Sequence, residues 1–395
     1  MYGKILLCVD NSEHSGFAVN QTAVIARTLG SSVVAAHVYA ARLHDRRFAD
    51  LEPGLPKEFQ NPRRLEASRK THDSLIGKGL HMISDSYLEA ARTQLDGVHV
   101  EFKSTEGKNY VELNRESAAG YNLAVIGARG LGLASVKDRS AAEALGSVCE
   151  RFLRRTGTDV LVVRTPLPFE GTILAAVDGS PESYEALNRA LKLAKLLGAC
   201  VEAVTCFDPD YHPVAFKSIA TVLSEENAKV FRFKEQEKLH DNIINHGLEN
   251  LYQGYLENAR VVAQGRGQQI ETRLLTGRPA LEIAARVREL QPSLVVVGRF
   301  GLHRTDDSDI GNTAETVVRL AETNVLVVNS KPNVEPLAWT VEAEEKVNHV
   351  PEFMRPMVKR AVELHARARG LTEVTEEVVS SAKTSHGVPL PGHGS

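Results

Sequence analysis

Long apolar runs are absent from this sequence. Nowhere do about 18 consecutive apolar residues occur, the length that a membrane-spanning helix needs. Met1–Lys4 lead directly into a segment of strand type, without the charged and apolar regions of a signal peptide. Neither sign of charge is in excess, since 50 Asp and Glu residues face 47 Lys and Arg residues. Without a positive excess there is no electrostatic case for nucleic acid or an anionic membrane, and we expect a cytoplasmic protein.

Cysteine is also scarce, with 4 in a chain of 395 residues. Cys8, Cys149, Cys200 and Cys206 fit neither the paired spacing of metal ligands nor a disulfide framework. We interpret them as buried, reduced thiols and predict no metal site. Cys200 and Cys206 lie an even number of positions apart on one predicted strand, and therefore on one face. For that face burial and redox sensing are the alternatives, and burial is favoured.

What the sequence does contain is an internal repeat. The apolar strand Ile5–Val9 ends at Asp10, and the strand Ile173–Val177 ends at Asp178, 168 positions later. Each aspartate precedes a turn with a serine, a segment of helical spacing and a second apolar strand. A carboxylate there either caps the following helix or contacts the sugar or base of a ligand, because it would repel phosphate.

Glycines form the second part of the repeat. In each half an apolar strand ends at a glycine, a second glycine follows three positions later, and a third precedes a helical segment. Such a loop brings free backbone N–H groups and a helix dipole toward a phosphate, although it can also be a tight turn only. A Lys-Ser/Thr pair after the glycines is missing, which excludes a Walker-type loop and strong ATP hydrolysis. The glycines are Gly127, Gly130 and Gly146 in the first half and Gly298, Gly301 and Gly311 in the second.

Each half also carries a long helical insert, over about residues 63–95 and 223–264. Apolar residues recur in both inserts at the same helical spacing, from Leu75 to Leu88 and from Ile243 to Leu256. The inserts either pack on each other and bury these stripes, or offer a surface to a partner protein. We favour mutual packing, because two amphipathic helices in one chain can satisfy each other.

The inserts share the pairs His72-Asp73 and His240-Asp241. Adjacent residues on a helix point about 100° apart, so both members of a pair do not easily bind one metal ion. A hydrogen bond to a neighbouring helix is the interpretation that we favour.

Alternating strands and helices of this length predict an α/β fold with two doubly wound five-stranded parallel sheets, related by a pseudo-twofold. Ligands of such sheets bind beyond the carboxyl ends of the strands, where both aspartates and both glycine loops fall. A helix from Pro356 to Arg369 that stops at Gly370 indicates a small all-α module after the repeat. The predicted parts are two α/β domains at residues 1–165 and 169–331, the module at 337–383 and a disordered tail at 384–395.

Residues 1–330 resemble a tandem universal stress protein, with two such domains in one chain. The resemblance rests on the aspartate after the first strand and on the spacing Gly-x2-Gly-x9-Gly-polar before the last strand. The nucleotide-binding version of the family has Ser or Thr after the third glycine. The second half keeps the spacing but has Asn312 there, whereas the first half has Ser147 but fifteen residues in the long interval.

The resemblance implies that ATP or another adenine nucleotide binds in at least one half, and the spacing favours the second. The aspartates would face adenine or ribose, and one residue at the end of each second strand would line the base. The glycines and helix starts would hold the phosphates, with Lys137 or Arg139 of the longer first loop offering charge. The implied residues are Asp10, Val38, Gly127, Arg129, Gly130, Gly146 and Ser147 in the first half, and Asp178, Cys206, Gly298, Arg299, Gly301, Gly311, Asn312 and Thr313 in the second.

The stretch from Trp339 to about Ala382 is similar to the small helical module at the C-terminus of the B subunit of light-independent protochlorophyllide reductase. The chain has no cysteine set for an iron–sulfur cluster, so we carry over no reductase activity. The matching residues are Trp339-Thr340, Glu342-Ala343, Val350-Pro351, Phe353, Arg355, Glu363, Gly370 and Thr375-Glu376.

Two functions follow as hypotheses. The first is a regulatory protein of the stress response, in which an adenine nucleotide orders a glycine loop and so alters which partner the inserts or the C-terminal module engage. The second is a nucleotide-free scaffold whose C-terminal module docks a partner complex. No nucleophile–base pair or metal triad at a recognisable spacing supports an enzyme. Whether two chains form a homodimer stays open.

Overall fold

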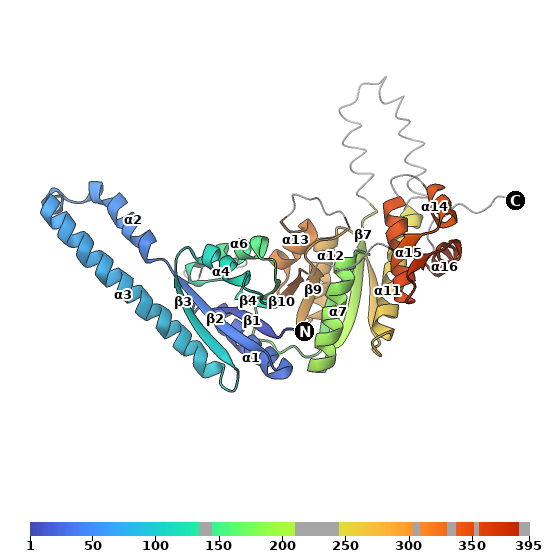
Figure 1. The fold of residues 1–395 in the computed structure, drawn as a ribbon, viewed down its shortest axis with the longest axis horizontal. Helices are drawn as coiled ribbons and strands as arrows, with labels where there is room; N and C mark the ends of the chain where they lie inside the picture. Colours follow the sequence, from blue (N-terminus) through green and yellow to red (C-terminus); the bar gives the residue numbers. More distant parts are fainter. Residues whose placement is uncertain (134–143, 210–244, 303–308, 330–336, 351–354, 387–395) are drawn as a thin grey trace, which may run out of the picture. The chain divides into compact units, whose positions relative to one another are not determined.

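The computed structural model describes residues 1–133, 144–209, 245–302, 309–329, 337–350 and 355–386. These residues form two compact units, of which the first comprises residues 1–168 with 323–326 and the second comprises residues 169–322 with 327–395 (Figure 1). Lys137, Arg139 and the pair His240-Asp241 lie outside the described residues, and so do the side chains of His72-Asp73.

The first unit is a parallel sheet whose strand order is β3-β2-β1-β4-β5. Strands β1 and β5 are almost wholly buried apolar segments, as expected of strands that are covered on both faces. Helix α1 begins at a Ser12 cap and ends at Gly30 in the left-handed region. The elements are β1 (Lys4–Cys8), α1 (Glu13–Leu29), β2 (Ser32–Tyr39), α2 (Ala41–Leu51), α3 (Pro62–Gln94), β3 (Val100–Glu106), α4 (Asn109–Ser117), β4 (Leu123–Gly127), α6 (Ser147–Arg155) and β5 (Asp159–Val163).

The second half of the repeat follows the same plan with the order β10-β9-β6-β7-β8. Helix α7 also begins at a serine cap, Ser180, and ends at a left-handed glycine, Gly198. The prediction of two doubly wound parallel sheets is confirmed. The elements are β6 (Thr172–Ala176), α7 (Pro181–Leu197), β7 (Cys200–Phe207), α11 (Asn245–Gln264), β8 (Glu271–Thr276), α12 (Pro279–Leu290), β9 (Leu294–Gly298), α13 (Asn312–Leu320) and β10 (Asn324–Val328).

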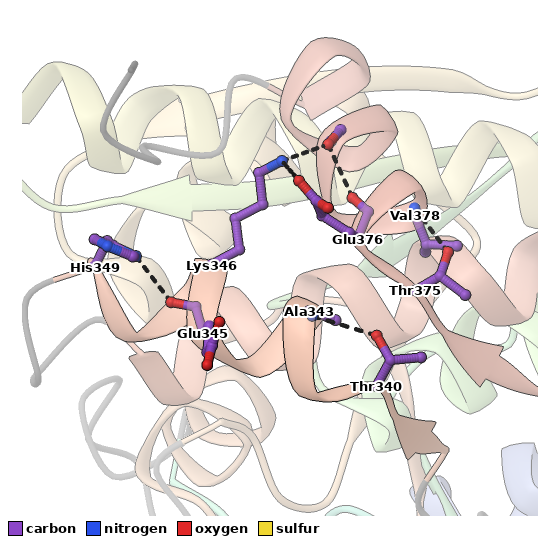
Figure 2. A network of polar contacts seen from close by, with 9 residues as sticks. Thr340, Ala343, Glu345, Lys346, His349, Thr375, Glu376 and Val378 are labelled. Atoms are coloured by element: carbon purple, nitrogen blue, oxygen red, sulfur yellow. Dashed lines mark hydrogen bonds and ion pairs between the residues drawn. The ribbon is translucent and has the colours of Figure 1, made fainter. Parts of the chain in front are cut away.

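The C-terminal part of the second unit has an apolar core of its own, built mainly from valine and alanine. Two similar pieces contribute to it, each a two-residue strand, a capping threonine and a helix. Figure 2 shows both caps: Thr340 accepts from the backbone N–H of Ala343, and Thr375 from that of Val378. The elements are β11 (Ala338–Trp339), α14 (Val341–Asn348), α15 (Arg355–Ala368), β12 (Glu373–Val374) and α16 (Glu376–His386).

Contacts between the helices of this module are partly ionic. Lys346 of α14 donates to Glu376 and Ser380 of α16, at 2.7 and 2.9 Å (Figure 2). Trp339 donates its indole N–H to Glu363 of α15 at 2.9 Å. The predicted small helical module, with a helix that ends just before Gly370, is confirmed.

Two expectations about burial are wrong. Leu75 and Ile83 of α3 are exposed, so the first insert does not bury its whole apolar stripe. Cys200 is also exposed, because it is the first residue of β7, whereas Cys8, Cys149 and Cys206 are buried as expected.

Candidate functional site

The two aspartates occupy matching turns at the carboxyl ends of β1 and β6. Oδ1 of Asp10 accepts hydrogen bonds from the backbone N–H of Ser12 at 3.1 Å and from its hydroxyl at 2.6 Å. Asp178 makes the same contacts with Ser180, at 3.0 and 2.5 Å. Each aspartate therefore positions the serine that caps the next helix, which supports the capping interpretation for one carboxylate oxygen.

The second oxygen of each aspartate lies against the glycine loop. A Cβ at Gly130 would lie 2.5 Å from Oδ2 of Asp10, and a Cβ at Gly301 would collide with Oδ2 of Asp178. A Cβ at Gly127 would lie 2.9 Å from the backbone of His14 and Ser15 at the start of α1. These glycines are thus required by close packing inside the turn, whether or not a phosphate also approaches.

The third glycine of each loop starts a helix. Gly146 donates its N–H to Ala128 at 2.8 Å, and Gly311 donates to Arg299 at 2.8 Å. In the described part of the chain no side chain caps the helices that follow, which begin at Ser147 and Asn312. Their first N–H groups and the positive end of the helix dipole are the features that favour an anion.

Two arginines and a histidine of the first unit lie around this loop. Nε of Arg129 is buried and has no hydrogen-bond partner within the described part of the chain. Burial, and then the charge of Arg129, lower the pKa of His14. Burial lowers the pKa of Arg164 as well; the neighbouring Cys149 opposes this effect, whereas Arg129 adds to it. Positive charge therefore accumulates here, and of these three residues only Arg129 was predicted from the sequence.

The equivalent positions of the second unit are less positive. Glu182 takes the place of His14, and Asn329 follows β10 where Arg164 follows β5. Phe300 takes the place of Arg129, and Arg299, one position earlier, is buried with its Nε donating to the carbonyl of Asp309 at 2.8 Å. Asp178 also differs from Asp10, because its Oδ2 accepts from the backbone N–H of Leu302 at 2.9 Å.

Aromatic side chains of α11 cover the aspartate turn of the second unit. The ring of Tyr255 lies against Gly179, which has a φ of +83° and follows Asp178 directly. Tyr252 lies beside Tyr255, with ring centroids 5.3 Å apart, and beside Phe207 at 6.0 Å. Leu302 of the glycine loop packs on the same cluster.

The first unit leaves the matching positions open. Asn11, the counterpart of Gly179, is exposed, and so is Leu131, the counterpart of Leu302. Tyr87, the counterpart of Tyr255, instead packs edge-on against His37 with centroids 5.2 Å apart. The two units thus share a backbone plan but differ in what covers it.

The two residues predicted to line a base, Val38 and Cys206, are buried at the ends of β2 and β7. The thiol of Cys206 donates to the carbonyl of Gly277 at 3.2 Å. Burial, and then the charges of Glu282 and Asp208, raise its pKa to about 12, so it is not a reactive thiolate.

A buried polar chain beneath α3 escaped the sequence analysis. Nδ1 of His37 lies 2.7 Å from the hydroxyl of Ser84, which lies 2.7 Å from that of Ser104. Burial lowers the pKa of His37, and Asp10 partly opposes this effect. The chain links β2, α3 and β3. A lone histidine in an apolar strand gives no signal from which this cluster could be predicted.

The described residues also bear on two other classes of site. They contain no group of three or more His, Cys, Asp or Glu side chains placed to hold a metal ion. Among the described helices, none is both long enough and apolar enough to cross a membrane.

Known proteins resemble this chain in sequence and in fold. A putative universal stress protein of Staphylococcus aureus is 31% identical over 179 residues, which are 44% of this chain and 95% of that protein. Two solved structures share the fold at a TM-score of 0.51, and each covers 83% of this chain. One is a functionally unknown protein from Pseudomonas aeruginosa, 18% identical with 92% of its chain covered. The other is a universal stress protein from Archaeoglobus fulgidus, 15% identical with 98% covered.

Two protein families match most of this chain. Residues 339–383 match the family described as the Proto-chlorophyllide reductase 57 kD subunit, in agreement with the resemblance of the C-terminal module. Residues 1–164 and 171–329 each match the Universal stress protein family. The chain therefore belongs to the universal stress protein family, with two such domains in tandem.

Proposed function

We propose that this chain binds an adenine nucleotide, such as ATP, in its first unit and acts as a regulatory binding protein rather than as an enzyme. The observation that supports the proposal best is the buried Nε of Arg129, which lies in the glycine loop without a hydrogen-bond partner in the described chain. A buried guanidinium N–H without a partner is costly, and a phosphate oxygen would satisfy it.

Other groups of the first unit fit the same ligand. The uncapped start of α6, at Ser147, would receive a phosphate through backbone N–H groups. Arg164 adds positive charge, and Asp10 keeps an oxygen directed at the loop for the sugar or base. The glycines Gly127, Gly130 and Gly146 would let the ligand approach the main chain.

The second unit is the weaker candidate, although its spacing matches the family pattern more closely. Asp178 and Arg299 of this unit already have partners in their own chain, the backbone N–H of Leu302 and the carbonyl of Asp309. Tyr255 and Leu302 cover the turn that a ribose would reach. In the proposed function this unit supports the fold, and the nucleotide acts by ordering the first glycine loop.

Isothermal titration with ATP, ADP and AMP tests the proposal. The variant Arg129→Gln should raise the Kd for the nucleotide by about 10- to 100-fold, because a hydrogen bond to a charged group contributes about 1.5–3 kcal/mol. Arg151→Gln is the control, since it removes the same charge from an exposed position on α6. Equal affinities of the two variants, or no heat with any nucleotide, would refute the proposal.

A second function, partner docking independent of nucleotide, is favoured by the separate core of the C-terminal module. In that case deletion of residues after 332 would abolish assembly with the partner complex, whether nucleotide is present or absent. A nucleotide requirement for that assembly would argue for the first function instead.

A further inference from the structure

Three cations surround one aromatic ring between α4 and α6, two helices of the first unit that lie side by side (Figure 1). The ring is that of Tyr110, in the first turn of α4. Nζ of Lys108 lies 5.0 Å from the ring centroid. Cζ of Arg151 and Cζ of Arg155, both on α6, lie 5.2 and 5.1 Å from it. All three distances are those of a cation–π contact. We call these four residues the Tyr110 cluster.

The positive charges of the Tyr110 cluster are not neutralised by the described part of the chain. Its three cationic side chains are exposed, and none of them forms an ion pair with a described residue. Every carboxylate of α4 and α6 has another cation as its partner. Three like charges around one ring repel one another, so an anion from outside the chain would stabilise the cluster. The existing pairs are Glu112 with Arg115, Glu116 with Lys103 and Glu150 with Arg154.

The internal repeat shows that the fold does not require this cluster. In the second unit the positions equivalent to Tyr110, Arg151 and Arg155 carry neither a ring nor a charge. By contrast, the ion pair of α6 recurs in α13 between Glu315 and Arg319 at 2.8 Å. Charges that the fold can lose, and that have no anionic partner in the described chain, indicate a ligand. The replacements are Ala280 for Tyr110, Thr316 for Arg151 and Leu320 for Arg155, whereas Arg278 keeps a cation at the position of Lys108.

We propose that the Tyr110 cluster binds an acidic segment of a partner protein. Arg151 and Arg155 are four positions apart on α6, so they share one face and their Cβ atoms are about 5–6 Å apart. Two carboxylates one helical turn apart on a partner helix have the same spacing and would pair with both guanidinium groups. Lys108 would contact a third acidic group. The ring of Tyr110 holds the three cations together for this contact.

The surroundings of the cluster favour a short acidic protein segment over a nucleic acid. A nucleic acid binds through many cations that follow its phosphates. The other cations of α4 and α6, Arg115 and Arg154, are already paired with carboxylates, and the whole chain has a net charge of −3. A long polyanion would therefore find no further unpaired cation on these two helices, whereas a segment with two or three carboxylates needs none.

Fluorescence anisotropy of the full chain with a labelled peptide tests the proposal. The peptide is helical, with glutamate at every fourth position and alanine elsewhere, and a second peptide has glutamine in place of glutamate. Only the glutamate peptide should bind. The double variant Arg151→Gln/Arg155→Gln should raise its Kd by about 10-fold, since each exposed ion pair that is lost accounts for about 3-fold. Tyr110→Leu, which keeps every charge, should raise the Kd by about 2- to 5-fold, because the ring no longer holds the cations together.

The matched control is Arg63→Gln/Arg64→Gln, which removes the same charge from exposed positions on α3. It should change the Kd by less than about 2-fold, and equal thermal midpoints should show that all variants are folded. No binding of the glutamate peptide would overturn the proposal. So would equal weakening by the two double variants, because binding would then follow net charge alone. A single-stranded oligonucleotide that binds more tightly than the peptide, through the same residues, would overturn it in favour of nucleic acid. The titrations contain no adenine nucleotide, so their result does not depend on the proposed function.

Discussion

The substitution Gly130→Ala tests how the aspartate and the glycine loop are built together. A Cβ at Gly130 would lie 2.5 Å from Oδ2 of Asp10, closer than real Cβ atoms approach an oxygen. The carboxylate would have to move away, and its other oxygen would lose the contacts to Ser12 at 3.1 and 2.6 Å. Loss of one to two charged hydrogen bonds predicts a decrease of about 2–4 kcal/mol in the free energy of unfolding.

Urea denaturation followed by circular dichroism measures this change. Gly132→Ala is the control, because Gly132 lies two positions further on and a Cβ there meets nothing within 4 Å. The control should change the free energy of unfolding by less than about 1 kcal/mol. In the double variant with Asp10→Ala the clash disappears. The decrease in its free energy of unfolding should therefore be smaller than the sum of the decreases in the two single variants. Equal destabilisation by Gly130→Ala and Gly132→Ala, or simple additivity with Asp10→Ala, would refute the reasoning.

Three further predictions concern other parts of the chain. Glu202→Gln should destabilise the second unit by about 3–5 kcal/mol in urea denaturation, because it breaks a buried ion pair with Arg286 at 2.8 and 2.6 Å; an unchanged midpoint would contradict this. Iodoacetamide should label Cys200 in the folded chain and spare Cys8, Cys149 and Cys206, as read by mass spectrometry; fast labelling of Cys206 would be the opposite result. Burial lowers the pKa of His37 in the folded chain, so the unfolded chain binds more protons near this pH. The free energy of unfolding should therefore fall as the pH drops below about 6.5, the ordinary pKa of histidine. The fall should level off below the lowered pKa of the folded chain. His37→Gln should flatten that decline in urea midpoints measured between pH 8 and pH 5, and an unaltered decline would exclude His37 as its source.

The sequence predicts the backbone of both units well, for a physical reason. Asp10 and Asp178 precede serine caps, and a cap admits few residue types, so the positions stand out without any structure. The glycines stand out equally, because a Cβ would lie 2.9 Å from neighbouring backbone at Gly127 and 3.2 Å from it at Gly298, which is tight at both positions. The duplication then follows from offsets between the halves that stay close to each other: 168 at the aspartates, 171 at the first two glycines and 165 at the third.

What the sequence does not predict is the difference between the two units. Tyr87 and Tyr255 occupy equivalent positions, yet Tyr255 covers Gly179 whereas Tyr87 packs on His37. Spacing alone favours the second glycine loop, whereas the Nε of Arg129 and the contacts of Leu302 favour the first. His14 and Arg164 belong to no recognisable motif, because they join the loop through tertiary packing. Such long-range contacts are set by the whole fold.

The central claim is that the first unit, and not the second, holds the adenine nucleotide. A crystal structure of the full chain grown with ATP tests this most directly. The account predicts electron density for phosphates beside Gly127, Arg129 and Ser147, and none beside Gly298 and Asn312. Density confined to the second unit, or absent from both at saturating ATP, would contradict it.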